Sequence, residues 1–149
     1  MSLSLLDAAL RYAGALGWSV FPLGDESKVP ITAHGYHDAT TDPEVITRWW
    51  SAYPTARIGV ACRASGFNAI DEDPRNGGTE TLRALEAQHG ILPRTNYQRS
   101  GSGGHHILMA DPSPGPSGWT RTQDTGGAIR GKLGPGVDVK CNGYIVVEP

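Results

Sequence analysis

Hydrophobic side chains recur at helical spacing near the start of the chain, at Leu5, Ala9, Tyr12 and Leu16. Because residues three or four positions apart lie on one face of a helix, this spacing predicts an amphipathic helix. Gly17 is placed to end it, since glycine readily adopts the left-handed conformation that closes many helices. The apolar run WSVFPL that follows predicts a strand.

Two further helices are predicted later in the chain. Thr41 or Asp42 can cap a helix over residues 43–51, and Pro43 suits its first turn because proline has no amide hydrogen to satisfy there. Helical periodicity returns over residues 79–89 and is followed by a glycine. Each helix therefore has a recognisable stop or start signal.

Short runs rich in apolar residues predict strands between and after these helices. RIGVACR and FNAIDED are separated by the link ASG, which predicts a hairpin-like arrangement. NYQRS and HHILMA flank a glycine loop, and VDVK and YIVVEP are joined through CNG, where Asn-Gly suits a tight turn with positive φ. Residues 111–136 are dominated by Pro, Gly, Ser and Thr and are predicted to form a long loop or lid.

This order of elements predicts an α+β fold, with a mixed, mostly antiparallel sheet and helices packed on it. A length of 149 residues, 38% of them hydrophobic, fits one domain, residues 1–149, around a single core. YIVVEP runs straight to the last residue, so we expect the domain to be truncated at its C-terminal end.

Composition narrows the classes of function. The chain has neither an apolar stretch long enough to span a bilayer nor a basic secretory leader, so we expect a cytoplasmic protein without membrane contact. Its two cysteines, Cys62 and Cys141, are isolated, which argues against a disulfide framework or an all-cysteine zinc site. The formal net charge of −2 argues against a broadly basic DNA-binding surface, so any contact with nucleic acid should be local.

Asp71 and Asp73 stand two residues apart at the end of an apolar strand. Strand side chains alternate, so both carboxylates are expected on one face with Phe67 and Ala69, while Glu72 points to the other. Carboxylate pairs suit hard cations such as Mg²⁺ or Mn²⁺ and leave positions open for phosphate oxygens. An isolated Asp-x-Asp is also common in solvated turns, and that interpretation stays open.

Asp138 alternates with two valines in GPGVDVK, so it is expected on the polar face of its strand, with Lys140. It is either a third carboxylate of a metal site or an ordinary outward polar residue. SGSGGHH places glycines before a strand rather than a helix, which excludes a dinucleotide fingerprint and a P-loop. His105 and His106 point to opposite faces, and only one can share the face of Asp71; that histidine can bind phosphate, ligate a metal, transfer a proton or be purely structural.

Cationic side chains lie near glycines or turns along the chain, where they can neutralise phosphate or stay solvated. They are Lys28, Arg99, Arg130, Lys132 and Lys140.

The order IDEDP, SGSGGHH, GPGVDVK and GYIVVEP resembles the bifunctional DNA primase/polymerase N-terminal domain (prim-pol) family of the archaeo-eukaryotic primase superfamily. The likeness extends upstream through AALRYAGALGWSVFPL, KVPITAHGYHDATTD and RIGVACRASGFNAIDEDP, and so covers nearly the whole chain. The resemblance implies an archaeo-eukaryotic primase-like fold. It also implies a nucleotidyltransferase, a DNA primase and DNA polymerase of plasmid or phage replication proteins, using NTP or dNTP on a single-stranded DNA template.

Transferred to this sequence, the family pattern makes Asp71, Asp73 and Asp138 the ligands of two Mg²⁺ or Mn²⁺ ions, and with His106 the catalytic residues. The resemblance places His106 on the phosphates of the incoming nucleotide. The expected nucleotide- and phosphate-binding residues are Ser102, Gly103, Gly104, His106, Lys140, Lys28 and Arg130.

The sequence departs from the family at His105, where arginine is frequent, and at His37, where lysine is frequent. It also has no helicase motif, so we expect a helicase domain or subunit outside this chain as a partner. Two alternatives stay open from the residues themselves. One is a metal-dependent nuclease or phosphoesterase with water as nucleophile, and the other is a non-catalytic nucleotide- or DNA-binding module of a larger replication initiator.

Overall fold

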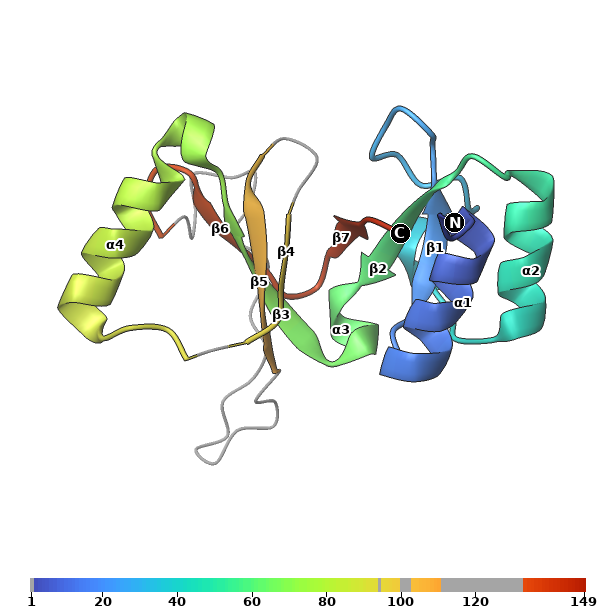
Figure 1. The fold of residues 1–149 in the computed structure, drawn as a ribbon, viewed down its shortest axis with the longest axis horizontal. Helices are drawn as coiled ribbons and strands as arrows, with labels where there is room; N and C mark the ends of the chain where they lie inside the picture. The colour runs from blue at the N-terminus through green and yellow to red at the C-terminus, as the bar shows by residue number, and fades with distance from the viewer. Residues whose placement is uncertain (1, 94, 100–102, 111–132) are drawn as a thin grey trace. The chain divides into compact units, whose positions relative to one another are not determined.

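The structure is a computed structural model, and it describes residues 2–93, 95–99, 103–110 and 133–149. These residues form two compact units (Figure 1). The first unit comprises Met1–Gly66 and Gly143–Pro149, and the second comprises Phe67–Asn142. The second unit is therefore an insertion within the first along the chain.

The first unit is built on a three-stranded antiparallel sheet of order β1-β2-β7. Its strands are β1 (Val20–Leu23), β2 (Arg57–Ala61) and β7 (Tyr144–Val147). Two helices, α1 (Leu5–Leu16) and α2 (Pro43–Ala52), pack on each other and against β1 (Figure 1). The short α3 (Cys62–Ser65) and the 3₁₀ turn η1 (Gly35–Asp38) complete the unit. Its core contains Val20, Phe21, Leu23, Ile46, Trp50, Ile58 and Val60, each almost fully buried.

Helix ends in this unit confirm the predicted signals. Gly17 caps α1 in the left-handed conformation, with φ of 67°. Asp42 caps α2, and its carboxylate accepts a hydrogen bond from the amide of Glu44.

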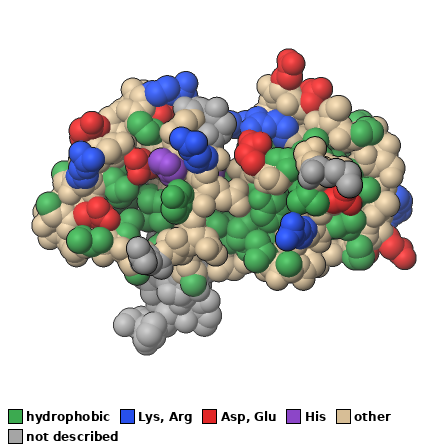
Figure 2. Space-filling view, in the orientation of Figure 1, with side chains coloured by type: hydrophobic (Ala, Val, Ile, Leu, Met, Phe, Trp, Pro, Cys, Tyr) green, Lys and Arg blue, Asp and Glu red, His purple; other side chains and the backbone are tan. Residues whose placement is uncertain are grey.

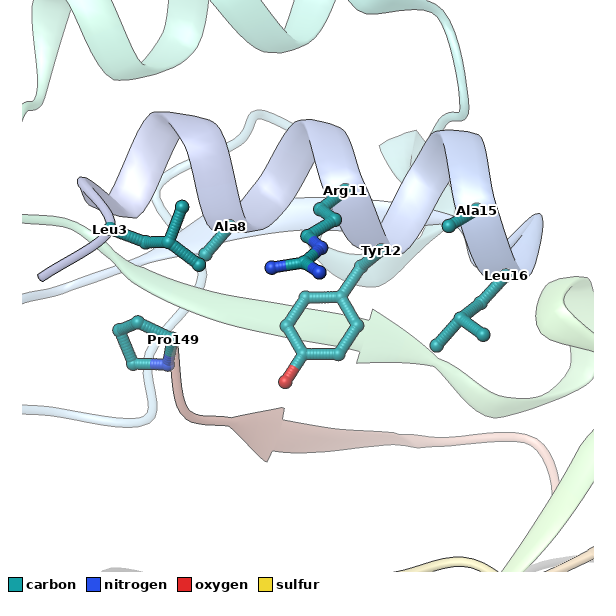
Figure 3. Close-up of a pocket in the computed structure, with 7 residues that line it drawn as sticks. All are labelled: Leu3, Ala8, Arg11, Tyr12, Ala15, Leu16 and Pro149. Atoms are coloured by element: carbon teal, nitrogen blue, oxygen red, sulfur yellow. The ribbon is translucent and has the colours of Figure 1, made fainter.

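Both ends of the described chain belong to this unit. Leu3 and Pro149 line one pocket of about 440 Å³ alongside α1 (Figure 3).

The second unit is a four-stranded antiparallel sheet of order β4-β5-β3-β6. Its strands are β3 (Phe67–Glu72), β4 (Tyr97–Arg99), β5 (His105–Ala110) and β6 (Val137–Lys140). The helix α4 (Gly78–His89) follows the 3₁₀ turn η2 (Pro74–Asn76) and packs against β3 and β6 on one side of the sheet (Figure 1). The other side of the sheet carries Asp71, His106 and Asp138.

The predicted α+β class is confirmed, and every strand pairing among the described residues is antiparallel. Two predicted hairpins are wrong. β2 and β3 do not pair, because the link ASG belongs to α3 and its capping glycine, and the chain passes there into another sheet. β6 and β7 likewise belong to different sheets, and Gly143 after Asn142 does not have the positive φ expected of a tight turn.

The sequence predicted a single core, whereas the described residues form two units, each around a sheet of its own. The assignment of residues 1–149 to one catalytic domain, truncated at its C-terminal end, stays a prediction. Most of the predicted loop 111–136 lies outside the described residues. None of the helices in the described part of the chain has the length and apolar character needed to cross a membrane.

Candidate active site

One row of polar residues runs across the sheet of the second unit. Asp71 on β3 stands directly opposite His106 on β5 and opposite Asp138 on β6. Gln98 on β4 extends the row, because it stands opposite His106. Directly opposed residues share a face and have Cβ atoms about 4.5–5.5 Å apart. The sheet register therefore brings together three of the four predicted catalytic residues.

Apolar anchors on the same face fix the position of this row. Phe67 and Ala69 precede Asp71 on β3 and are 5% and 0% exposed, and Leu108 stands opposite Ala69. Because side chains alternate along a strand, burying these residues forces Asp71 and His106 onto the same face. The predicted change from apolar to acidic character along β3 is confirmed as a boundary within one face of the sheet.

His106 is buried and directed at the acidic neighbour. Its Nε2 atom lies 3.6 Å from Oδ1 of Asp71, and its side chain is 9% exposed. The pair becomes an ion pair when the imidazole is protonated, and the protonated ring is a donor at both nitrogens. His105 points to the opposite face, where its ring lies edge-on to the ring of Tyr97, with the two ring centroids 5.5 Å apart. Of the two histidines, His106 is thus the one on the face of Asp71.

Asp138 carries a buried oxygen that needs a partner. Its Oδ1 atom is inaccessible to solvent and accepts no hydrogen bond from the described residues. Leaving a buried carboxylate oxygen without a donor or cation is unfavourable, so its position beside Asp71 suits a bound cation. The predicted polar face is confirmed, and Asp138 is part of the polar row.

Asp73 has a different environment from the other two aspartates. It caps η2, and its carboxylate accepts hydrogen bonds from the amide of Arg75 at 3.0 Å and from Nδ2 of Asn76 at 2.6 Å. The bond from Asn76, with a smaller contribution from the amide and guanidinium of Arg75, lowers the pKa of Asp73 below its usual value. Its carboxylate is thus engaged in its own turn, and its role as a third metal ligand stays a prediction.

The carboxylates of the polar row fit a divalent cation whose coordination is completed by substrate. Among the described residues, no group of three or more His, Cys, Asp and Glu side chains is arranged to hold a metal ion. Mg²⁺ is, however, commonly held by one or two carboxylates together with substrate phosphates and water. The carboxylates of Asp71 and Asp138 match that donor set. They include the buried Oδ1 atom of Asp138, which accepts no hydrogen bond from the described residues.

Glycine backbone surrounds the end of the sheet next to this row. Gly103 and Gly104 immediately precede β5, and Gly103 has a φ of 86°. Gly136, with a φ of 74°, precedes β6, and its carbonyl accepts a hydrogen bond from the amide of Asp73 at 2.8 Å. Such backbone lets a phosphate approach closely. The glycine before β5 was predicted from the sequence, whereas the contact of Gly136 with Asp73 was not.

The predicted cationic residues are distributed differently. Lys140 lies on the face of the polar row, because it stands opposite Ala69. Lys28 belongs to the first unit, where its carbonyl accepts a hydrogen bond from Tyr144, and the structure does not place it relative to the row. Ser102, Arg130 and Lys132 lie outside the described residues.

Charged residues also occur elsewhere on the visible surface and on the opposite face of the sheet. In Figure 2, lysine and arginine side chains are interspersed with acidic ones on the face shown. Glu72 lies on the opposite face from Asp71, as predicted, and accepts a hydrogen bond from the hydroxyl of Thr79. Arg99, opposite His105, shares that second face.

Sequence reasoning missed Gln98. Alternation in NYQRS separates Gln98 from Tyr97 and Arg99, but nothing local says which strand it meets. Only the pairing of β4 with β5 puts it beside His106.

Comparison with known proteins adds the family. A search of curated proteins found no match. The family model described as "Bifunctional DNA primase/polymerase, N-terminal" matches residues 9–149, which include every residue of the polar row. On this match, the chain belongs to the bifunctional DNA primase/polymerase N-terminal family.

Proposed function

We propose that this chain catalyses metal-dependent nucleotidyl transfer from NTP or dNTP on a single-stranded DNA template, within a plasmid- or phage-type replication protein. Family membership supports primase and polymerase activity in general. The observation that carries the finer proposal is the row of Asp71, His106 and Asp138 on three adjacent strands. It combines carboxylates for a cation with a donor for phosphate in one place.

Asp71 and Asp138 are the proposed ligands of Mg²⁺ or Mn²⁺, and Asp73 is proposed as a third ligand in a two-metal site. When bound, the cations would neutralise the triphosphate and favour ionisation of the attacking hydroxyl. His106 donates a hydrogen bond to a phosphate oxygen, and burial beside Asp71 holds its ring in one orientation.

The surrounding residues position the triphosphate. Gly103 and Gly104 let the phosphates approach the backbone at the start of β5, and Lys140 adds positive charge on the same face of the sheet. Ser102, Lys28 and Arg130 are proposed as further phosphate contacts. A helicase domain or subunit outside this chain would supply the unwound template.

The transfer itself is a displacement at the α-phosphorus. The 3′-oxygen of the growing strand forms the new bond, the bond from the α-phosphorus to the bridging oxygen breaks, and pyrophosphate leaves. The proton of the hydroxyl passes to water. Because phosphoryl transfer depends mainly on positioning and charge stabilisation, replacing one carboxylate should be far more damaging to the rate than to the fold.

Primer extension and de novo synthesis on single-stranded DNA test the proposal. Labelled nucleotides and Mg²⁺ or Mn²⁺ are supplied to the native chain, to Asp71→Asn and Asp138→Asn, and to Asp25→Asn as a matched control at an exposed loop position. We expect products that require the metal, a loss of about 100-fold or more in each site variant and none in the control.

Other results would point elsewhere. Strand cleavage in place of synthesis would support the nuclease alternative. Nucleotide binding by the native chain without any products would support a non-catalytic module. Full synthesis by both site variants would overturn the assignment of the polar row.

A further inference from the structure

The polar row includes one residue to which the proposed transfer assigns no role, Gln98. It is the middle residue of β4, the edge strand in the order β4-β5-β3-β6 (Figure 1), and it stands directly opposite His106. Gln98 is half-buried, whereas Tyr97 and Arg99 on either side of it are exposed and lie on the other face of the sheet. The sheet thus holds an uncharged amide beside His106, on the side away from Asp71.

The polar row changes in charge across the sheet. It runs from Gln98 through His106 and Asp71 to Asp138, so hydrogen-bond donors are at one end and carboxylates at the other. Adjacent strands lie about 4.8 Å apart, which puts β4 about 12 Å from the line midway between β3 and β6. An extended triphosphate, bound to a cation at one end and to a hydrogen-bond donor at the other, spans a separation of this order.

Gln98 also lies next to the glycines that precede β5. Arg99 stands opposite His105, so Gln98 and His106 are the following pair along the two strands and the first of these pairs on the face of the polar row. A phosphate close to the backbone of Gly103 on this face is therefore near both side chains. The amide of glutamine has two hydrogens to donate, and hydrogen bonds to charged oxygens are stronger than those between neutral groups.

We propose that Gln98 donates a hydrogen bond to the terminal phosphate of the incoming NTP or dNTP. This inference rests on the proposed nucleotidyl transfer, in which cations at Asp71 and Asp138 hold the phosphates nearer the sugar. Gln98 is remote from the bond that breaks at the α-phosphorus. It therefore contributes to the preference for a triphosphate over a diphosphate rather than to the transfer step.

Equilibrium dialysis with labelled dATP and dADP in the presence of Mn²⁺ tests the contact without requiring synthesis. Gln98→Leu should weaken dATP binding about tenfold and leave dADP binding nearly unchanged. Gln98→Glu should weaken dATP binding further, because its carboxylate repels the phosphate, and Gln98→Lys should recover most of the loss. In primer extension, Gln98→Leu should raise KM more than it lowers kcat.

This order of variants separates a phosphate contact from a purely structural role. A residue that only orients His106 would tolerate Gln98→Glu better than Gln98→Leu, because a carboxylate also accepts a hydrogen bond from an imidazole. Gln88→Glu, at an exposed position on α4 in the same unit, is the matched control and should bind both nucleotides as the native chain does. The ¹⁵N spectra report separately whether each variant is folded.

The results distinguish this inference from the proposed function. Native-like preference for dATP in Gln98→Leu, equal loss of dATP and dADP binding, or better binding by Gln98→Glu than by Gln98→Leu would each overturn the role of Gln98, even if the native chain synthesises DNA. The expected order of variants in a chain that makes no product would support the phosphate contact and contradict the transfer. A native chain that binds neither nucleotide and makes no product would overturn both.

Discussion

The opposed aspartates lead to a prediction about stability and activity together. Asp71 and Asp138 are directly paired across β3 and β6, so two carboxylates of like charge share one face. Like charges at such positions destabilise a sheet. Asp138→Asn keeps the size of the side chain and removes one charge. We therefore expect this variant to be more stable than the native chain when no metal is present. With metal, we expect it to be much less active than the native chain.

The magnitude follows from the register. With Cβ atoms about 5 Å apart, two unit charges repel by about 0.8 kcal/mol in a water-like dielectric and by about 3 kcal/mol at an effective dielectric constant of 20. The partly exposed position of both residues and the nearby ring of His106 favour the lower figure. A gain of about 1 kcal/mol should raise the melting temperature by about 3 °C for a chain of this size.

Thermal and urea unfolding in the presence of a chelator measure this gain, and the same experiments with Mn²⁺ measure metal binding. Native protein at a metal concentration of about 100 times Kd should gain about 2.7 kcal/mol. Asp138→Asn should gain much less, so the order of stability reverses when metal is added. Asp25→Asn, in an exposed loop, should follow the native chain under both conditions.

Two results would contradict this prediction. A metal-free Asp138→Asn that is less stable than the native chain would mean that Asp138 makes a favourable contact rather than a repulsive one. Equal stabilisation of both proteins by Mn²⁺ would mean that the cation binds elsewhere.

Three further predictions concern other parts of the fold. Gly59→Ala should destabilise the first unit by about 1–3 kcal/mol in urea unfolding, because the new Cβ would lie 2.6 Å from Cζ of the buried Phe21; a second change, Phe21→Leu, should recover part of the loss. The hydrogen bond from the amide of His34 is the main cause that lowers the pKa of Asp38 below its usual value, and the side chain of His34 contributes less. The contribution of Asp38 to stability is therefore present above its unfolded pKa and disappears as pH falls through its folded pKa. NMR titration of this carboxyl should show the lowered midpoint, and Asp38→Asn should remove this acid dependence. Burial raises the pKa of Tyr144 above its usual value, so the contribution of this residue to stability is complete below the unfolded pKa and is lost as pH rises through the folded one; ultraviolet titration of the native chain should show a raised tyrosine midpoint that is missing in Tyr144→Phe.

Local signals predicted the helices and the faces of the strands. Gly17 and Asp42 act within one helical turn, so their roles could be predicted without knowing the rest of the fold. The alternation of side chains likewise predicted that Asp71 and Glu72 lie on opposite faces of the sheet, and that His105 and His106 do so as well. These inferences depend on the geometry of a single segment.

Strand partners could not be predicted in this way. The links ASG and CNG look like hairpin turns, yet each is a passage between two sheets. Pairing depends on residues far apart in sequence, such as the contact of β2 with β7, and the local pattern carries no information about it. Gln98 was missed for the same reason, because its neighbour His106 is identified only by the register of β4 on β5.

The first unit is made of two segments that are far apart in the sequence, and this has a consequence for folding during synthesis. When the ribosome has made the first 66 residues, β2 has β1 on one side and an unpaired edge on the other, since β7 begins only at Tyr144. Domains generally fold in the order in which they are made, but here the inserted unit can close its own sheet before the enclosing one is complete. A released chain that ends at residue 142 should therefore show a protease-resistant second unit and a sensitive first one.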